Sequence, residues 1–176
     1  MVSKAYIDKL AHRAATSPLN DLPEPTEEQK KSGIYKKGHI KIHGLNISIE
    51  NPKGSFRTGI DPNGKSWKSR LYAHYGYITG INNIDKDGDH VDVFIGPKPN
   101  SDIVFIINQK NNKDKFDEHK VMLGWNRMTD ALDGYLKNYK PDWDGIMSIH
   151  RSHIDNFKNW LDNGNKRIPY RDCNSV

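Results

Sequence analysis

The sequence predicts an α+β fold, a small closed antiparallel β-barrel of the OB type with two flanking helices. Two observations lead to this prediction. Short apolar runs with the two-residue period of β-strands recur between about residues 39 and 123. Two segments with helical spacing follow toward the C-terminal end. Many short strands followed by helices are typical of α+β proteins, and a small barrel with the helices outside accommodates them.

The composition favours one domain with a tail. A chain of 176 residues is long enough for one hydrophobic core. The formal net charge of +5 suits a surface that faces phosphates or nucleic acid, although an excess of this size also serves solubility alone. A single cysteine, Cys173, excludes an internal disulfide framework and favours a reducing compartment.

We expect neither an export signal nor a membrane span. The first 15 residues contain no long apolar core, and the longest aliphatic run, residues 103–107, is far too short to cross a bilayer. We therefore expect a cytoplasmic protein with no membrane contact.

The N-terminal residues 1–35 are expected to form a helix and a proline-rich arm. Tyr6, Leu10 and several alanines give a short helical pattern that Pro18 ends or closely follows. Residues 16–33 are polar and proline-rich, which indicates a linker or extended arm. Residues 36–164 then form the folded domain, and residues 165–176 form a C-terminal tail.

The strands follow in order after residue 38. Ile40 and Ile42 share one face, and a phase shift after Gly44 predicts two strands joined at a bulge or tight turn. Residues 58–70 are expected to form a turn-rich basic loop. Residues 71–78 form a strand rich in tyrosine, and further strands are expected at about 90–95, 102–108 and 118–123, the last after a hairpin loop at 111–114.

Two helices complete the predicted domain. The first runs from Met128 to Tyr139 with apolar residues at helical spacing, and Pro141 ends it. The second starts at Ser152, with Asp155 as its capping-box partner, and stops near Gly164.

A cluster of carboxylates precedes one of the strands. Asp87 and Asp89 lie on either side of a glycine, and Asp92 enters the apolar run that follows. Three clustered negative charges are costly unless a cation or basic side chains offset them. The cluster is therefore a candidate site for a hard cation such as Mg²⁺, which prefers oxygen ligands. An EF-hand is excluded, because His90 stands where its glycine belongs and Gly96 where its bidentate glutamate belongs.

A wider set of charged and phenolic residues fits metal-assisted phosphoryl transfer. The set comprises Glu50, Asp87, Asp89, Asp92, Asp117 or Glu118, with Lys53, Arg57, Arg70, Lys120, Lys140, Tyr75 and Tyr139. Carboxylates hold divalent cations, and lysine and arginine neutralise the phosphate charge, so no protein nucleophile is needed.

These residues carry a resemblance to family I soluble inorganic pyrophosphatases, closest to the pyrophosphatase-like domains of phage and mobile-element proteins. Five segments match in the family's order over about residues 38–145. They are Glu50-Asn-Pro-Lys-Gly-Ser55, Tyr75-Gly-Tyr77, Asp87-Gly-Asp-His-Val-Asp-Val-Phe94, Asp117-Glu-His-Lys-Val121 and Tyr139-Lys140. The resemblance implies hydrolysis of inorganic pyrophosphate to orthophosphate with Mg²⁺, and the histidines beside the motifs leave Mn²⁺ open as a softer metal.

The resemblance also implies roles for single residues. Asp87 and Asp92 would bind the metals, Glu118 or Asp117 would complete that site, and Asp89 would act as general base. Glu50 would support a metal-bound water, and Tyr75 would hydrogen-bond near the nucleophile. The substrate contacts would come from Lys120, Tyr139, Lys140 and Arg57 or Lys53, with Arg70 or Lys68 as a substitute for the family's arginine.

Several departures from the family pattern leave alternatives open. His90 replaces a proline, and His74 replaces an asparagine. Strand alternation is expected to turn these two histidines and His119 away from the site. The substrate could be another phosphoanhydride or a nucleotide, or the chain could be a non-catalytic anti-defence binding protein on the same fold. Nucleic acid is a less favoured partner than a small phosphate compound, and homo-oligomerisation stays open.

Overall fold

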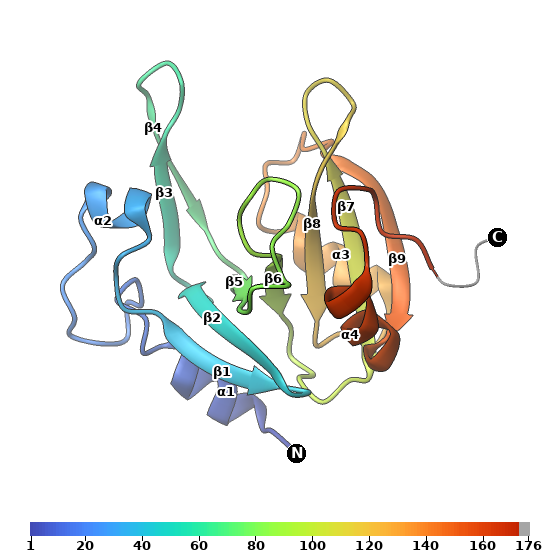
Figure 1. The fold of residues 1–176 in the computed structure, drawn as a ribbon. Helices are drawn as coiled ribbons and strands as arrows, with labels where there is room; N and C mark the ends of the chain where they lie inside the picture. The colour runs from blue at the N-terminus through green and yellow to red at the C-terminus, as the bar shows by residue number, and fades with distance from the viewer. Residues whose placement is uncertain (173–176) are drawn as a thin grey trace.

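A seven-stranded sheet forms the centre of the computed structural model, which describes residues 1–172 (Figure 1). Its strands lie in the order β1-β2-β5-β6-β8-β7-β9. They are β1 (Gly38–Ile42), β2 (Leu45–Asn51), β5 (His74–Ile78), β6 (Asp92–Ile95), β7 (Ile103–Lys110), β8 (Phe116–Leu123) and β9 (Ile146–His153). The predicted tight turn after β1 is confirmed, because His43 and Gly44 have φ angles of 52° and 80°.

The sheet supports the α+β class, but a closed antiparallel barrel is not shown. Strands β6 and β8 pair in parallel, whereas the other described pairs are antiparallel. Within residues 1–172, β1 and β9 stand at opposite ends of the strand order with no pairing between them. The parallel pair arises because the β5–β6 and β7–β8 hairpins lie side by side with β6 against β8, which no sequence pattern specifies.

A separate two-stranded sheet includes the residues 58–70 that were expected to form a basic loop. Strands β3 (Phe56–Ile60) and β4 (Ser66–Arg70) form a hairpin, which rises beyond the main sheet in Figure 1. At its turn, Asp61 Oδ1 accepts hydrogen bonds from the backbone N–H groups of Asn63 and Lys65. Most side chains of this hairpin are exposed or half-buried, so the apolar alternation that marks a strand is absent.

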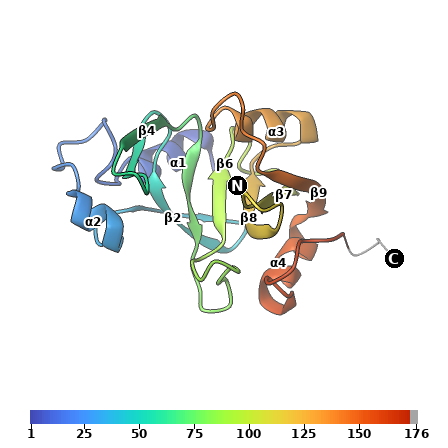
Figure 2. The ribbon, with the colours of Figure 1, turned by 90° about the horizontal axis from the view of Figure 1, so that it is seen from above.

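Strand alternation divides the core into two clusters on opposite faces of the sheet. Val93 and Val121 belong to one cluster, and their neighbours Phe94 and Met122 belong to the other. Helices α1 (Lys4–Ala11) and α4 (Ile154–Asn163) pack on the first cluster, and α3 (Met128–Leu136) packs on the second. Figure 2 shows α3 and α4 on either side of the strands β7, β8 and β9.

The helices differ from the predictions at their ends. Helix α1 ends at Ala11, well before Pro18, and the proline-rich arm contains a short helix, α2 (Glu27–Ser32), that was not predicted. Helix α4 is capped by His153 instead of Ser152, because the Ser152 hydroxyl donates to the carbonyl of His153. The expected capping box at Ser152 was therefore wrong.

The described residues offer no candidate membrane span and do not include the cysteine. Among residues 1–172, no helix is both long enough and apolar enough to cross a membrane. Cys173 lies outside the described residues.

Candidate functional site

A cavity of about 660 Å³ opens where β2, β5, β6 and β8 come together. Nine of the residues singled out in the sequence line it. They are Glu50, Arg57, Tyr75, Asp87, Asp89, Asp92, Glu118, Lys120 and Tyr139. Residues far apart in the chain thus form one polar surface with five carboxylates.

Lys120 lies at the centre of this surface because of the parallel register between β6 and β8. Asp92 and Lys120 are direct partners across that pair, and Glu118 lies two residues earlier on the same face of β8. The Lys120 Nζ lies 2.5 Å from Asp92 Oδ2 and 2.6 Å from Glu118 Oε1. It also donates to the Tyr75 hydroxyl at 3.0 Å, which in turn donates to Asp92 at 3.0 Å.

The charge of Lys120 is held firmly, although its side chain is only 5% exposed. Burial by itself disfavours the ammonium form, but Tyr75, Asp92, Tyr139 and Glu118 outweigh it and keep the pKa of Lys120 well above its ordinary value. A permanent buried cation therefore neutralises part of the carboxylate cluster.

Two of the carboxylates have raised pKa values. Burial raises the pKa of Glu50, and the charge of Asp92 adds to the shift, while Arg57 opposes it. Burial likewise raises the pKa of Glu118 against the effect of Lys120, and Asp87 adds to the rise. Both carboxyl groups therefore hold a proton more readily than exposed ones, and a cation bound beside them would favour their charged form.

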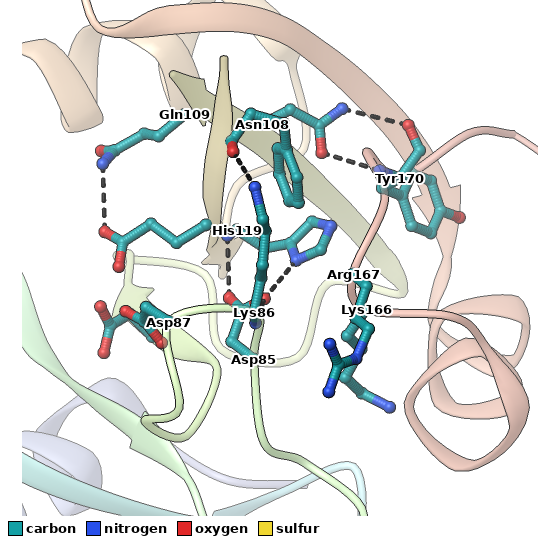
Figure 3. Close-up of polar contacts among 12 residues, drawn as sticks. Asp85, Lys86, Asp87, Asn108, Gln109, His119, Lys166, Arg167 and Tyr170 are labelled. Carbon is teal, nitrogen blue, oxygen red and sulfur yellow. Dashed lines mark hydrogen bonds and ion pairs between the residues drawn. The ribbon is translucent and has the colours of Figure 1, made fainter. Parts of the chain in front are cut away.

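The buried side-chain amide of Gln109 on β7 supports the site, although it was not predicted from the sequence. Gln109 Nε2 donates to Glu118 Oε1 at 3.1 Å, as Figure 3 shows. Its Oε1 accepts from the hydroxyls of Tyr135 and Tyr139, and burial raises the pKa of Tyr139 to about 12. The available sequence signal was that Gln109 is a polar residue just after the apolar run 103–107.

The turn that carries Asp87 and Asp89 lies at the mouth of the cavity. Gly88 has a φ of 89°, a conformation that favours glycine, and the Asp89 N–H donates to Asp87 Oδ1 at 3.0 Å. Both carboxylates are exposed. They are therefore free to approach a ligand.

Four predicted site residues do not line the cavity. Lys53 and Arg70 border other hollows near α1, and the Arg70 guanidinium lies over the ring of Tyr72. Lys140 is exposed and Asp117 is half-buried on β8. Of the alternatives left open, Arg57 and Glu118 occupy the cavity, and Lys53 and Asp117 do not.

The three histidines beside the motifs have different surroundings. His119 points to the opposite face of the sheet, where its ring packs against Trp160. His74 turns toward α1 and pairs with Asp8 at 2.7 Å. His90 does line the cavity, stacked on Tyr77 with ring centroids 5.1 Å apart, so the expectation that it turns away was wrong. It stands outside β6, where alternation does not control its direction.

The N-terminal arm adds basic groups to the same cavity. Lys30, Lys31 and Lys37 line it, and Lys30 Nζ donates to the Thr58 hydroxyl of β3 at 2.8 Å. From the sequence, a linker or extended arm was predicted for this segment. Its fold over the cavity depends on contacts with β3, which local sequence does not show.

The carboxylates fit a divalent cation by their chemistry. Hard cations prefer carboxylate oxygens, and five carboxylates line this cavity. Within residues 1–172, however, no three acidic, histidine or cysteine side chains are gathered closely enough to hold a metal ion. Lys120 stands between Asp92 and Glu118 instead.

An α+β fold with carboxylates, lysines and tyrosines in one cavity is typical of enzymes that act on phosphate compounds. Comparison with known families makes this specific. The chain matches the family described as Inorganic Pyrophosphatase over residues 27–162. It belongs to that family and is a pyrophosphatase-like hydrolase.

The other comparisons add a structural neighbour. A crystal structure described as an inorganic phosphatase from Anaplasma phagocytophilum matches with a TM-score of 0.31 and 18% sequence identity, covering 77% of this chain and 94% of that one. No curated protein sequence matches the chain.

Proposed function

We propose that this chain hydrolyses inorganic pyrophosphate to orthophosphate in the cavity around Lys120, with a divalent cation. One observation carries the proposal: five carboxylates line the same cavity as Arg57, Lys120 and Tyr139, whose side chains are suited to hold phosphate oxygens. Water can serve as the nucleophile, since cation and basic side chains together offset the charge of the phosphates.

Asp87, Asp92 and Glu118 are the residues that would hold the cation, either Mg²⁺ or Mn²⁺. The bound cation would supply Lewis acidity and offset negative charge on the phosphates. Because Lys120 now contacts Asp92 and Glu118, the cation and this lysine compete for the same carboxylates.

The chain's own residues would divide the remaining tasks. Asp89 is exposed at the cavity mouth, so it is placed to take the proton from water as general base. Glu50 would hold that water in place, and Tyr75 would donate a hydrogen bond nearby. Once its carboxylate partners bind a cation, Lys120 would be free to hold a phosphate oxygen.

The proposal is tested by measuring orthophosphate released from pyrophosphate with Mg²⁺ or Mn²⁺. Asp92→Asn should lower kcat/KM at least about a hundredfold, because it removes a charge that contacts both Tyr75 and Lys120. Asp114→Asn removes an exposed carboxylate at the β7–β8 hairpin and is the matched control. Lack of metal-dependent turnover in the wild type would refute the proposal.

A second candidate substrate is a longer phosphoanhydride, such as a nucleoside polyphosphate. Lys30, Lys31 and Lys37 extend the basic lining beyond the groups that a pyrophosphate needs. A panel of nucleotides assayed beside pyrophosphate separates the two. A non-catalytic anti-defence binding role would instead predict ligand binding that survives Asp87→Ala and Asp92→Ala.

A further inference from the structure

Asp85 is a buried carboxylate that the proposed chemistry does not use. Its side chain is 2% exposed and does not line the cavity around Lys120. Its two oxygens accept hydrogen bonds from the backbone N–H of Lys86, the backbone N–H of His119 and the Nδ1 of His119, each at 2.8 Å. Three N–H donors offset the cost of burying this charge.

Asp85 contacts His119 just before the point where β8 begins to pair with β6. The parallel ladder between β6 and β8 begins at Asp92 and Lys120, so residues of β8 before Lys120 have no partner in β6. The Asp85 carboxylate takes the place of that missing strand by accepting the His119 N–H. It thereby ties the carboxylate turn to β8 one residue from Glu118.

The ring of His119 is held on the far face of the sheet. It is fully buried and packs against Phe116 and Trp160, with ring centroids 4.7 and 4.8 Å away. Nε2 has no hydrogen-bond partner within the described residues. An N–H on Nδ1 therefore suits this place, because Asp85 accepts it, whereas a buried N–H on Nε2 would have no acceptor there. Trp160 of α4 thus packs against the imidazole ring that is hydrogen-bonded to Asp85.

Asp85 also closes the turn itself. Its N–H donates to the Asp89 carbonyl at 2.6 Å, and its carbonyl accepts from the Gly88 N–H at 3.0 Å. Lys86 donates from Nζ to the Phe116 carbonyl, which adds a second attachment to β8. Figure 3 shows Asp85 and Lys86 side by side between the turn and β8. The turn is therefore fixed both internally and against the strand that carries Glu118.

We propose that Asp85 and His119 are a positioning pair, which sets Asp87 and Asp89 at the correct distance from Glu118 and thereby determines the affinity of the cavity for a divalent cation. The proposal rests on the function proposed above. Outer partners that orient cation ligands typically change metal affinity by about 10- to 100-fold when they are removed.

The test compares Asp85→Asn with the wild type in two measurements. Titration calorimetry with Mg²⁺ should show affinity weaker by at least about tenfold. In the metal-free protein, hydrogen exchange of the His119 amide and of the turn 85–90 should become faster, because an amide group cannot accept all three N–H donors.

The matched control is Asp8→Asn, which breaks another carboxylate–histidine pair. Asp8 and His74 lie 2.7 Å apart, and the His74 side chain is 5% exposed, but this pair joins α1 to β5. Its loss should leave Mg²⁺ affinity within about twofold of the wild type, since additivity holds for distant sites. An equal loss in both variants would overturn the proposal, because it would indicate general destabilisation.

A second variant keeps the test decisive if Asp85→Asn does not fold. His119→Phe preserves the packing against Trp160 and the backbone N–H but removes Nδ1, so it should also weaken Mg²⁺ binding. Unchanged Mg²⁺ affinity in a folded variant, or absence of saturable Mg²⁺ binding by the wild type, would overturn the proposal. A wild type that binds Mg²⁺ but releases no orthophosphate would instead refute only the proposed function.

Discussion

Replacing Lys120 by methionine should make the protein depend on a divalent cation for its stability. The Nζ contacts Asp92 and Glu118 at 2.5 and 2.6 Å, so those two oxygens lie at most about 5 Å apart. Without the lysine, two negative charges at that distance repel by about 3 kcal/mol at an effective dielectric constant near 20. Burial already raises the pKa of Glu118, so this carboxylate can take up a proton when Lys120 is absent. The free energy of that protonation sets an upper limit on the cost of the repulsion.

The prediction is measured by urea unfolding and Mg²⁺ titration at neutral pH. Without metal, Lys120→Met should lose about 2–3 kcal/mol of unfolding free energy. Mg²⁺ at a hundred times its Kd should restore about 2.7 kcal/mol. Mg²⁺ should also bind at least about tenfold more tightly than to the wild type, because the competing ammonium group is gone. Pyrophosphate turnover should nevertheless fall, since the phosphate contact is lost.

Lys37→Met is the matched control. Lys37 lines the same cavity but contacts the Gly33 carbonyl and the Tyr35 ring, and within residues 1–172 it forms no ion pair with a carboxylate. This variant should stay within about 1 kcal/mol of the wild type in stability. The reasoning would be refuted if Lys120→Met were as stable as the wild type without metal, or bound Mg²⁺ no more tightly.

Three further predictions concern the rest of the fold. Because burial lowers the pKa of His74 below its ordinary 6.5, the unfolded chain binds the proton first, and the free energy of unfolding should fall as the pH drops below 6.5. Urea unfolding at several pH values should show a smaller fall for His74→Asn, and an equal fall would contradict this origin. Gly76→Ala should abolish folding, since its Cβ would meet the Ser48 carbonyl oxygen at 1.8 Å; a native-like circular dichroism spectrum would argue against it. Phe157→Ala should lower the free energy of unfolding by about 3–5 kcal/mol, because the ring is fully buried under the sheet, and a loss below about 1 kcal/mol would be inconsistent with that packing.

The sequence was informative wherever side-chain chemistry and strand period coincide. Asp92 interrupts an apolar alternation and was predicted to point away from the aliphatic face of its strand, whereas Lys120 and Glu118 were assigned to the site by the family resemblance. All three line the cavity. The motif order then identified Tyr75 and Glu50 as their neighbours. Local pattern was sufficient here because the residues occupy strands whose opposite face is buried.

Other parts depend on contacts that local sequence does not encode. The β3–β4 hairpin stands away from the core, so neither face has an apolar pattern. Strand β9 lies at the sheet edge with half-buried residues throughout much of its length, which obscures its period. Helix α2 does carry a capping box of Thr26 and Gln29, but its proline-rich surroundings favoured a linker. Gln109 became a site residue only through its pairing opposite Glu118.

The parallel contact between β6 and β8 has a consequence for how the protein assembles. It joins two antiparallel units, β1-β2-β5-β6 and β8-β7-β9, each built from neighbouring segments of the chain. Asp92 belongs to one unit and Lys120 to the other. Each unit could form its own hydrogen bonds while the cavity was still incomplete. Activity therefore requires the two units to dock. During refolding, activity should return after the strands have formed and not before.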